Sequence, residues 1–490
     1  TPGIHHVMAR TIKDLFCRFW SMKGFSVDRK AGWDTHGLPV ELSVEKKLNI
    51  TKEDIGDKIS IEKYNQECRK DVMRYKKEWE SLTKKMGYWV NMKNPYITYE
   101  NKYIETVWWL LKKLFEKKLL YKGYTVQPFS PCAGTGLSTH ELNQPGCYKN
   151  VKDTSVTAQF EIIKDKNSEF IFNNNNVYFI AWTTTPWTLP SNTALALGEK
   201  INYVKIKTQN PYSKETVEVI MARDLINNYF SNKSEYKITQ NFLGHELLNL
   251  KYKQLMPYAQ PKKGDAFKTI HGDFVSTESG TGIVHVAPSF GSDDMIIAKK
   301  NNIGSLTLVD KYGRFTKEVV DFENEYVKKE YDSKQTESVD VRIAVKLKKE
   351  KKAFKIEKYE HSYPHCWRTD KPILYYPLDS WFIKTTAVKE KLIKLNEKIN
   401  WHPKSTGEGR FKNWLQNLVD WNLSRSRFWG TPLPIWMSEN KKETKCIGSI
   451  EELEKNVARR KKRPFEMTFC CTEKAFKLLA KKCEHIWRKI

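Results

Sequence analysis

Hydrophobic residues near the start of the chain recur at the spacing of an amphipathic helix. Apolar side chains occupy one face from residue 8 to residue 24, where Gly24 ends the pattern. A short strand is expected next, over Phe25 to Lys30, and longer helical periodicity predicts helices over 61–86 and 102–119. Helices that alternate with short strands predict an α/β domain, with its ligand at the strand-to-helix turns.

The pattern changes near Val151. Short runs rich in β-branched residues, separated by turn residues, predict a β-rich region: TSVTAQFEII, NVYFIAW, NYVKIKT and ETVEVIMA. We therefore expect four segments: the first half of an α/β domain over 1–150, an inserted β-rich domain over 151–355, a return to the first domain over 356–455, and a basic tail of unknown origin over 456–490. Two domains in tandem would produce a similar pattern.

Length and composition support a folded, multidomain protein. A chain of 490 residues with 40% hydrophobic residues is long enough for two to four cores. No apolar stretch approaches the ~20 residues that span a bilayer. The first residues, TPGIHHVMAR, also lack the basic and apolar regions of a signal peptide. We expect a soluble cytoplasmic protein with no membrane segment.

The nine cysteines are scattered, and their number is odd. This pattern argues against a disulfide scaffold and suits a reducing compartment. Cys132 and the pair His365–Cys366 could contribute to a structural zinc site. The paired spacing of zinc ligands is missing, however, so no metal site is predicted.

The formal net charge of +26 indicates a polyanionic partner, because clustered lysine and arginine attract phosphate backbones. Lysine-rich solvated helices would give the same excess. Charge alone does not name the partner.

Two segments of the first domain carry candidate binding chemistry. Pro2-Gly3-Ile4-His5-His6 leads into the helix from Val7, where unpaired N–H groups and imidazoles could bind phosphate. An ordinary capped helix start with two surface histidines explains the same residues.

The second segment surrounds Asp34 in Gly32-Trp33-Asp34-Thr35-His36-Gly37. A carboxylate between an aromatic ring and two glycines can hold a ligand ammonium group, since glycine lets backbone approach closely. A turn with a capping aspartate is the alternative.

A third set lies in the β-rich region. Thr183, Thr184 and Thr185 follow an apolar strand, and adjacent hydroxyls can position a water and an ester by hydrogen bonds. His285 and Asp294 add an imidazole and a carboxylate nine residues apart. A threonine-rich strand edge would be the structural explanation.

These motifs together resemble the isoleucine-specific class I aminoacyl-tRNA synthetases. TPGIHH, TIKD and GWDTHGLPVE resemble the start of that family. The likeness continues to about residue 455 in WTTTPWTLPSNTALAL, GTGIVHVAPSFGSDD, YEHSYPHCWRTDKPILYYPLDSWF and NLVDWNLSRSRFWGTPLPIW. The resemblance implies a Rossmann-like catalytic domain interrupted by a β-rich editing domain. It also implies ATP, Mg²⁺, isoleucine and tRNA-Ile as ligands.

The resemblance also implies roles in amino-acid activation. Pro2, Gly3, His5 and His6 would bind ATP, with His6 at the last histidine of the family's His-Ile-Gly-His signature. Here the signature reads Gly-Ile-His-His, as though histidine and glycine had changed places. Asp34 would hold the α-ammonium group of isoleucine.

Trp381 would line the same pocket as Asp34. Arg425 and Arg427 would lie near substrate or tRNA, unless they are structural surface arginines. In the editing domain, Asp294 would anchor the amino group of a mischarged amino acid. Thr183 to Thr185 and His285 would bracket the scissile ester and its attacking water.

The family's second signature, Lys-Met-Ser-Lys-Ser, does not occur in the sequence. We expect a chain truncated at both ends. Three functions are compatible with it: part of an isoleucine–tRNA ligase, an editing-only deacylase of Val-tRNA-Ile, or a non-catalytic tRNA-binding remnant.

Overall fold

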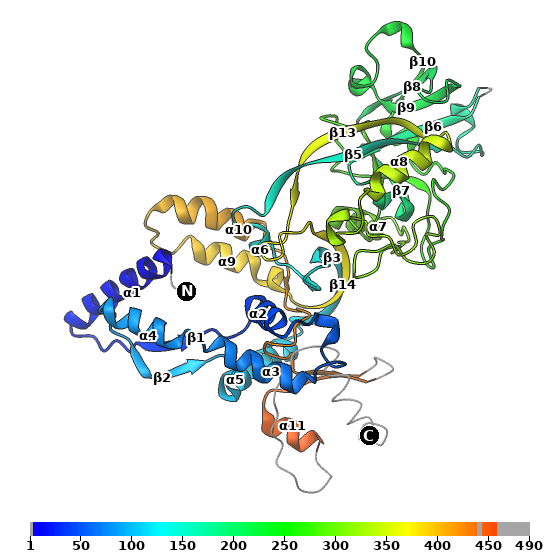
Figure 1. Cartoon of the computed structure of the whole chain (residues 1–490). Helices are drawn as coiled ribbons and strands as arrows, with labels where there is room; N and C mark the ends of the chain where they lie inside the picture. Colours follow the sequence, from blue (N-terminus) through cyan, green and yellow to red (C-terminus); the bar gives the residue numbers. More distant parts are fainter. Residues whose placement is uncertain (1–2, 174, 439–442, 458–490) are drawn as a thin grey trace. The chain divides into compact units, whose positions relative to one another are not determined.

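A computed structural model describes residues 3–173, 175–438 and 443–457 (Figure 1). They fall into two units: one within Tyr124–Ser380, and a second unit within Thr1–Gly123 and Trp381–Ile490. Strands β3 (Leu120–Ser130) and β14 (Leu374–Ile383) carry the chain between the units. Within the described part of the chain, no helix has the length and apolarity to cross a membrane.

The unit built from the chain's two outer parts is mainly helical. Its helices and strands are α1 (Ile4–Met22), β1 (Lys30–Trp33), α2 (Leu38–Leu48), α3 (Ile61–Val72), α4 (Lys76–Lys85), β2 (Asn91–Ile97), α5 (Asn101–Glu116), α9 (Lys389–Asn396), α10 (Lys412–Gln416), β15 (Trp421–Asn422), β16 (Ile435–Met437), β17 (Thr444–Cys446) and α11 (Ile450–Val457). Strands β1 and β2 pair in parallel.

The unit Tyr124–Ser380 is rich in strands. Its elements are β4 (Thr135–Gly136), α6 (Thr139–Leu142), β5 (Tyr148–Glu161), β6 (Val177–Thr183), β7 (Ala194–Leu197), β8 (Asn202–Gln209), β9 (Thr216–Ala222), β10 (Tyr236–Leu243), β11 (Lys268–His271), β12 (Ile283–Val286), α7 (Ser292–Lys300), α8 (Val339–Lys349) and β13 (Ala353–Pro364). The segments TSVTAQFEII, NVYFIAW, NYVKIKT and ETVEVIMA are found in β5, β6, β8 and β9, as expected.

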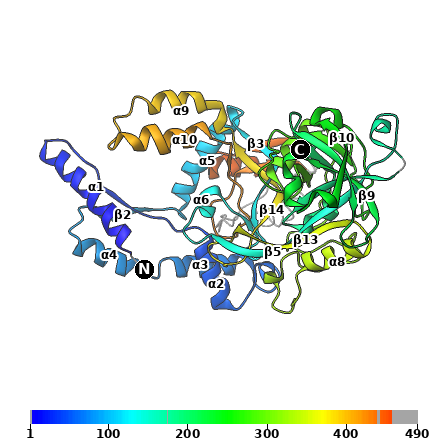
Figure 2. The ribbon, with the colours of Figure 1, turned by 90° about the horizontal axis from the view of Figure 1, so that it is seen from above.

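One nine-stranded sheet organises this unit, in the order β10-β8-β9-β6-β12-β7-β11, with β5 on β6 and β13 on β5. Figure 2 shows the long antiparallel ribbon of β5 and β13, in which Ala353 pairs with Ala158 and Pro364 with Tyr148. Strand β12 lies between β6 and β7: Val284 pairs with Trp182 in parallel, and His285 pairs with Leu195 in antiparallel. This register places the end of β6 beside His285.

Burial of apolar side chains holds the sheet and its covering segments together. Strand β6 buries Val177, Phe179 and Ile180 completely, because its sequence is apolar on both faces. Helix α8 buries Val339, Ile343, Ala344 and Leu347, which recur at helical spacing and join the same core cluster.

The prediction of a strand over 25–30 is wrong: the strand in this region is β1, Lys30–Trp33. Pairing decides its position, because β2 lies opposite residues 30–33 and not opposite the preceding segment. Gly32 is required there, since a Cβ atom at this position would lie 2.1 Å from the ring of Tyr96. The apolar character of Phe25 gave no sign of this partner.

The single helix expected over 61–86 is two helices, α3 and α4. No glycine or proline separates them, and the break reflects different packing partners. Helix α3 packs on α2 through Tyr64 and Cys68. Helix α4 meets α1, where Arg10 donates a hydrogen bond to Thr83 (2.9 Å) and lies over the ring of Trp79. The helix expected over 102–119 is α5.

A buried ion pair between β8 and β9 gives a test of this sheet. Lys205 is fully buried; its Nζ lies 3.3 Å from Glu218 and donates to the Ile171 carbonyl (2.6 Å). We expect Lys205→Met to lower the free energy of unfolding by about 3–5 kcal/mol, because Glu218 is left as an uncompensated buried charge. Urea unfolding followed by tryptophan fluorescence measures the loss.

The exposed pair Lys351–Glu215 is the control. Lys351→Met should cost no more than about 1 kcal/mol. Equal losses at the two lysines would contradict the structure.

Candidate functional site

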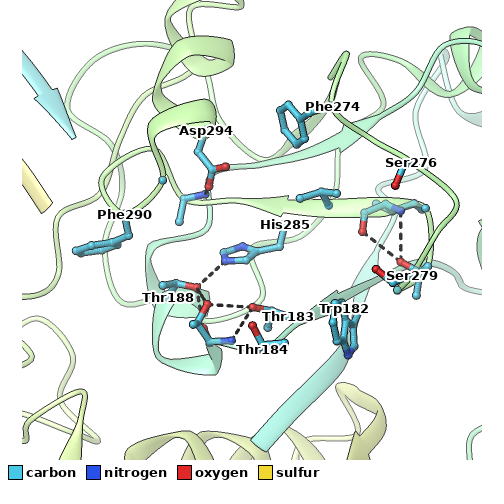
Figure 3. Close-up of a pocket in the computed structure, with 18 residues that line it drawn as sticks. Trp182, Thr183, Thr184, Thr188, Phe274, Ser276, Ser279, His285, Phe290 and Asp294 are labelled. Carbon is cyan, nitrogen blue, oxygen red and sulfur yellow. Dashed lines mark hydrogen bonds between the residues drawn. The ribbon is translucent and has the colours of Figure 1, made fainter. Parts of the chain in front are cut away.

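A pocket of about 390 Å³ lies in the unit Tyr124–Ser380, where the end of β6, strand β12 and the start of α7 meet. Figure 3 shows the threonines and Asp294 on opposite sides of it, with His285 between them. All five residues expected from the sequence in this region therefore line one pocket: Thr183, Thr184, Thr185, His285 and Asp294.

The threonines form a hydrogen-bonded turn. Strand β6 ends at Thr183, whose Oγ1 accepts the backbone N–H of Thr185 (3.1 Å). A short 3-10 helix, η3 (Pro186–Ser191), follows and carries Thr188. The hydroxyl of Thr188 donates to the carbonyl of Thr185 (2.8 Å). These bonds hold the hydroxyl groups of Thr183 and Thr188 in place.

Both ring nitrogens of His285 are engaged. Asn192 has a fixed orientation, because its Oδ1 accepts the Tyr252 hydroxyl (2.8 Å) and its Nδ2 donates to the Ala194 carbonyl (2.9 Å). That Nδ2 also donates to His285 Nδ1 (3.0 Å). The proton of the neutral ring is therefore on Nε2, which donates to Thr188 Oγ1 (2.8 Å).

The buried position of His285 keeps it uncharged. Burial lowers the pKa of His285 from 6.5 to about 4, because the cationic ring would lose its hydration. At neutral pH the ring is a neutral donor to Thr188. The arrangement suits a group that holds a hydroxyl in place.

Asp294 has the opposite chemistry. It lies in the first turn of α7, and its Oδ2 accepts the Ala287 N–H (2.8 Å). Burial, helped by the nearby charge of Asp293, raises the pKa of Asp294 to about 6. A partly buried carboxylate that faces a pocket can bind a ligand ammonium group, which would restore the charge balance.

Glycines shape this pocket. A Cβ atom on Gly291 would lie 2.6 Å from Cγ of Asp294, so only glycine leaves the carboxylate its position. Gly282 has a φ of +72°, and a Cβ atom there would lie 2.4 Å from the Cβ atom of Ala222. Backbone therefore forms the wall of the pocket at these positions.

The residues expected to bind phosphate lie in the other unit, at the start of α1. The helix begins at Ile4, so the expectation that it begins at Val7 is wrong: His5 and His6 are in its first turn. His6 Nδ1 accepts the Gly3 N–H (3.0 Å), which caps the helix and leaves the ring proton on Nε2. His6 Nε2 can donate to an anion at this helix end. Pro2 lies outside the described residues.

Asp34 is exposed and directly follows β1, at the carboxyl end of a parallel strand. The next residue anchors the turn: Thr35 donates its N–H to Thr98 Oγ1 (2.9 Å). The backbone of Trp381 is held by two hydrogen bonds: its carbonyl accepts the Leu423 N–H (2.9 Å), and its N–H donates to Ser424 Oγ (2.8 Å). Its place beside Asp34 stays a prediction.

Sequence reasoning missed several residues that complete these sites. Glu41 accepts the N–H groups of Phe428 (2.6 Å) and Trp429 (2.8 Å), which ties the Asp34 segment to a segment almost four hundred residues later. Trp429 Nε1 donates to the Thr35 carbonyl (2.6 Å).

Arg427 lies 3.8 Å from Glu41, and Arg425 donates to the carbonyl of Ser424 (2.9 Å), so both arginines have structural contacts.

In the β-rich unit, Thr188 and Asn192 could have been found, because both belong to the polar run that follows Thr185. Tyr252 gave no signal. Metal ligands do not gather in any group of three or more among residues 3–173, 175–438 and 443–457.

The environment of His285 predicts a pH effect on stability. The pKa is 6.5 when unfolded and about 4 when folded, so the unfolded state binds more protons between these values and stability falls as pH falls from 6.5 to 4. This group should contribute a loss of about 3 kcal/mol. Unfolding of the wild type and of His285→Gln, compared from pH 7 to pH 4, measures it. Parallel curves would contradict the buried neutral ring.

Comparison with known proteins places the chain in a family. The model of the class I tRNA synthetases (I, L, M and V) matches residues 1–485. Isoleucine–tRNA ligases of Cytophaga hutchinsonii and Bacteroides fragilis are 60% and 55% identical to this chain over 95% and 93% of its length. The match covers 45% and 44% of those relatives, so the chain spans less than half of their length.

A crystal structure of the editing domain of P. knowlesi cytosolic leucyl-tRNA synthetase matches 32% of the chain and 73% of that domain, with 12% identity and a TM-score of 0.25. The family model, by contrast, covers nearly the whole chain. The chain belongs to the class I tRNA synthetases, in the group of isoleucine, leucine, methionine and valine enzymes.

Proposed function

We propose that this chain is part of an isoleucine–tRNA ligase and that its β-rich unit hydrolyses mischarged Val-tRNA-Ile. The observation that carries the proposal is the single pocket that joins a hydroxyl-bearing turn, a neutral imidazole and the carboxylate of Asp294. The similarity to isoleucine–tRNA ligases supports the choice of substrate.

The two sides of the pocket suit the two ends of an aminoacyl ester. Asp294 would bind the ammonium group of the amino acid, and the hydroxyls of Thr183 to Thr185 would hold the ester and a water molecule. The water oxygen bonds to the ester carbonyl carbon, the bond to the ribose oxygen breaks, and the ribose oxygen takes a proton. His285 would act through Thr188, since both ring nitrogens already have partners.

Hydrolysis has a physical reason in this family. Isoleucine differs from valine by one methylene group, and in a hydrophobic pocket that group changes the binding free energy by only about 1–3 kcal/mol. The isoleucine enzymes are the standard example of this limit on discrimination. A second pocket that accepts valine and excludes isoleucine removes the resulting errors. We propose that residues 151–355 form this editing domain.

The other unit would contribute to isoleucine activation. We propose that residues 1–150 and 356–455, which include residues 124–150 and 356–380 of the unit Tyr124–Ser380, belong to a Rossmann-like catalytic domain. The parallel pairing of β1 with β2 and the position of Asp34 at the end of β1 support this assignment. His6 would donate to an ATP phosphate, and Asp34 would bind the isoleucine ammonium group. Mg²⁺ would bind with the ATP phosphates, which supply oxygen ligands.

An editing-only deacylase is the second candidate for this chain. The sequence contains the complete set Thr183 to Thr185, His285 and Asp294, whereas the Lys-Met-Ser-Lys-Ser signature does not occur in it. A non-catalytic tRNA-binding function is the third candidate, and absence of deacylation would favour it.

Hydrolysis of Val-tRNA-Ile tests the proposal at Asp294. We expect Asp294→Asn to lower kcat/KM about 100-fold, equivalent to about 3 kcal/mol, because the substrate ammonium loses a buried counter-charge. Because the pKa of the carboxyl group is about 6, wild-type kcat/KM should fall as pH drops below 6. Ile-tRNA-Ile should be hydrolysed much more slowly.

Asp293→Asn is the matched control, since Asp293 is an exposed neighbour in the same helical turn. Its kcat/KM should stay within about twofold of the wild type. Equal losses of kcat/KM in Asp294→Asn and Asp293→Asn would contradict the proposed role of Asp294 in binding the substrate.

Isoleucine-dependent ATP–pyrophosphate exchange tests the activation half of the proposal. The flexible lysines of the second signature stabilise the pyrophosphate leaving group in the family, and this sequence does not contain them. We expect exchange at the background rate of an enzyme-free sample. A rate of about 10 s⁻¹, ordinary for enzymes, would show a complete activation site in this chain.

A further inference from the structure

The hydroxyl-bearing turn is anchored from outside the pocket. Trp187 is the first residue of η3 with a backbone N–H to donate, because Pro186 has none. That N–H donates to Oδ1 of Asp340 (2.8 Å), which lies in the first turn of α8. The bond is buried, and it joins residues 153 positions apart in the sequence.

A charge network holds Asp340 in turn. Asp340 is 1% exposed, and its Oδ2 lies 3.9 Å from Nζ of Lys328, which is also buried. Lys328 Nζ donates to Asp153 Oδ2 (3.1 Å) on strand β5 and lies 4.6 Å from the ring centre of Tyr363 on strand β13. The Asp340 carboxylate therefore has a fixed direction and a counter-charge.

The network contacts the turn but does not line the pocket. Asp340 and Lys328 are not among the pocket residues, whereas Thr185 and Thr188, on either side of Trp187, are. Thr188 Oγ1 in turn accepts a hydrogen bond from Nε2 of His285. The hydrogen bond from Trp187 to Asp340 thus holds the backbone segment that carries Thr185 and Thr188, whose hydroxyl groups face the pocket.

We propose that Asp340 is a positioning residue of the hydrolytic site: by accepting the Trp187 N–H it fixes η3, and with it the spacing of Thr185, Thr188 and His285. This inference rests on the proposed editing function. The positive charge of Lys328 offsets the free-energy cost of burying the Asp340 carboxylate. Buried ion pairs can often be replaced by apolar groups without loss of stability. Stability alone therefore does not require a carboxylate at position 340, whereas the hydrogen bond from Trp187 requires an acceptor there.

Variants at Asp340 separate the accepted hydrogen bond from the charge. Asp340→Asn keeps an oxygen that can accept the Trp187 N–H, while Asp340→Ala removes the acceptor. In the 490-residue chain we expect Asp340→Ala to lower kcat for Val-tRNA-Ile about 10- to 100-fold, with KM within about twofold, because misplaced groups cost rate more than binding. Asp340→Asn should stay within about threefold of the wild type.

Leu347→Ala controls for loss of stability, since Leu347 is a buried residue of α8 that lies about two turns from Asp340, the residue that contacts Trp187. It should lower the melting temperature and leave kcat near the wild-type value. Equal losses of kcat in Asp340→Asn and Asp340→Ala, or a loss of the same size in Leu347→Ala, would overturn the positioning role.

Hydrogen exchange of the peptide over residues 186–191 tests the contact without any substrate. The Trp187 amide should exchange slowly in the wild type and in Asp340→Asn, and at least 10-fold faster in Asp340→Ala. Unchanged exchange in Asp340→Ala would overturn the inference. If the wild type did not hydrolyse Val-tRNA-Ile, the proposed function would fail, whereas the exchange result would still decide whether Asp340 holds the turn.

Discussion

The parallel pairing of β12 with β6 is the interaction on which the pocket depends. These strands are about one hundred residues apart in sequence, yet Val284 lies opposite Trp182. That register brings the end of β6, with its threonines, beside His285, and it directs the chain after β12 into α7 with Asp294. A shift by one residue would turn His285 to the other face of the sheet.

Burial makes the polar groups of this pocket depend on one another. His285, Asn192 and Thr188 are all nearly inaccessible, so each needs hydrogen-bond partners to offset the loss of water. The chain of bonds from Tyr252 to Asn192, His285 and Thr188 meets that need and leaves one tautomer of the ring. Once satisfied, such a network is rigid.

The two ionisable groups of the pocket respond to burial in opposite directions. Burial favours the uncharged form of each, so the pKa of His285 falls and that of Asp294 rises. His285 has neutral partners on both nitrogens and stays neutral. Asp294 faces open space, where a cationic group could pair with it. One physical effect thus gives a hydrogen-bond donor on one side and a cation site on the other.

The sequence by itself determined the strands β5, β6, β8 and β9 and the helix α5, because short β-branched runs and helical periodicity are local signals. The five expected residues of the pocket were grouped by the family resemblance of their motifs, and all five line it. Only the tertiary structure decided the position of β1, the break between α3 and α4, and the partners Tyr252 and Asp340. Each of these depends on a contact between segments distant in sequence. Local periodicity carries no information about such partners, because they are selected by packing and by the need to satisfy buried polar groups.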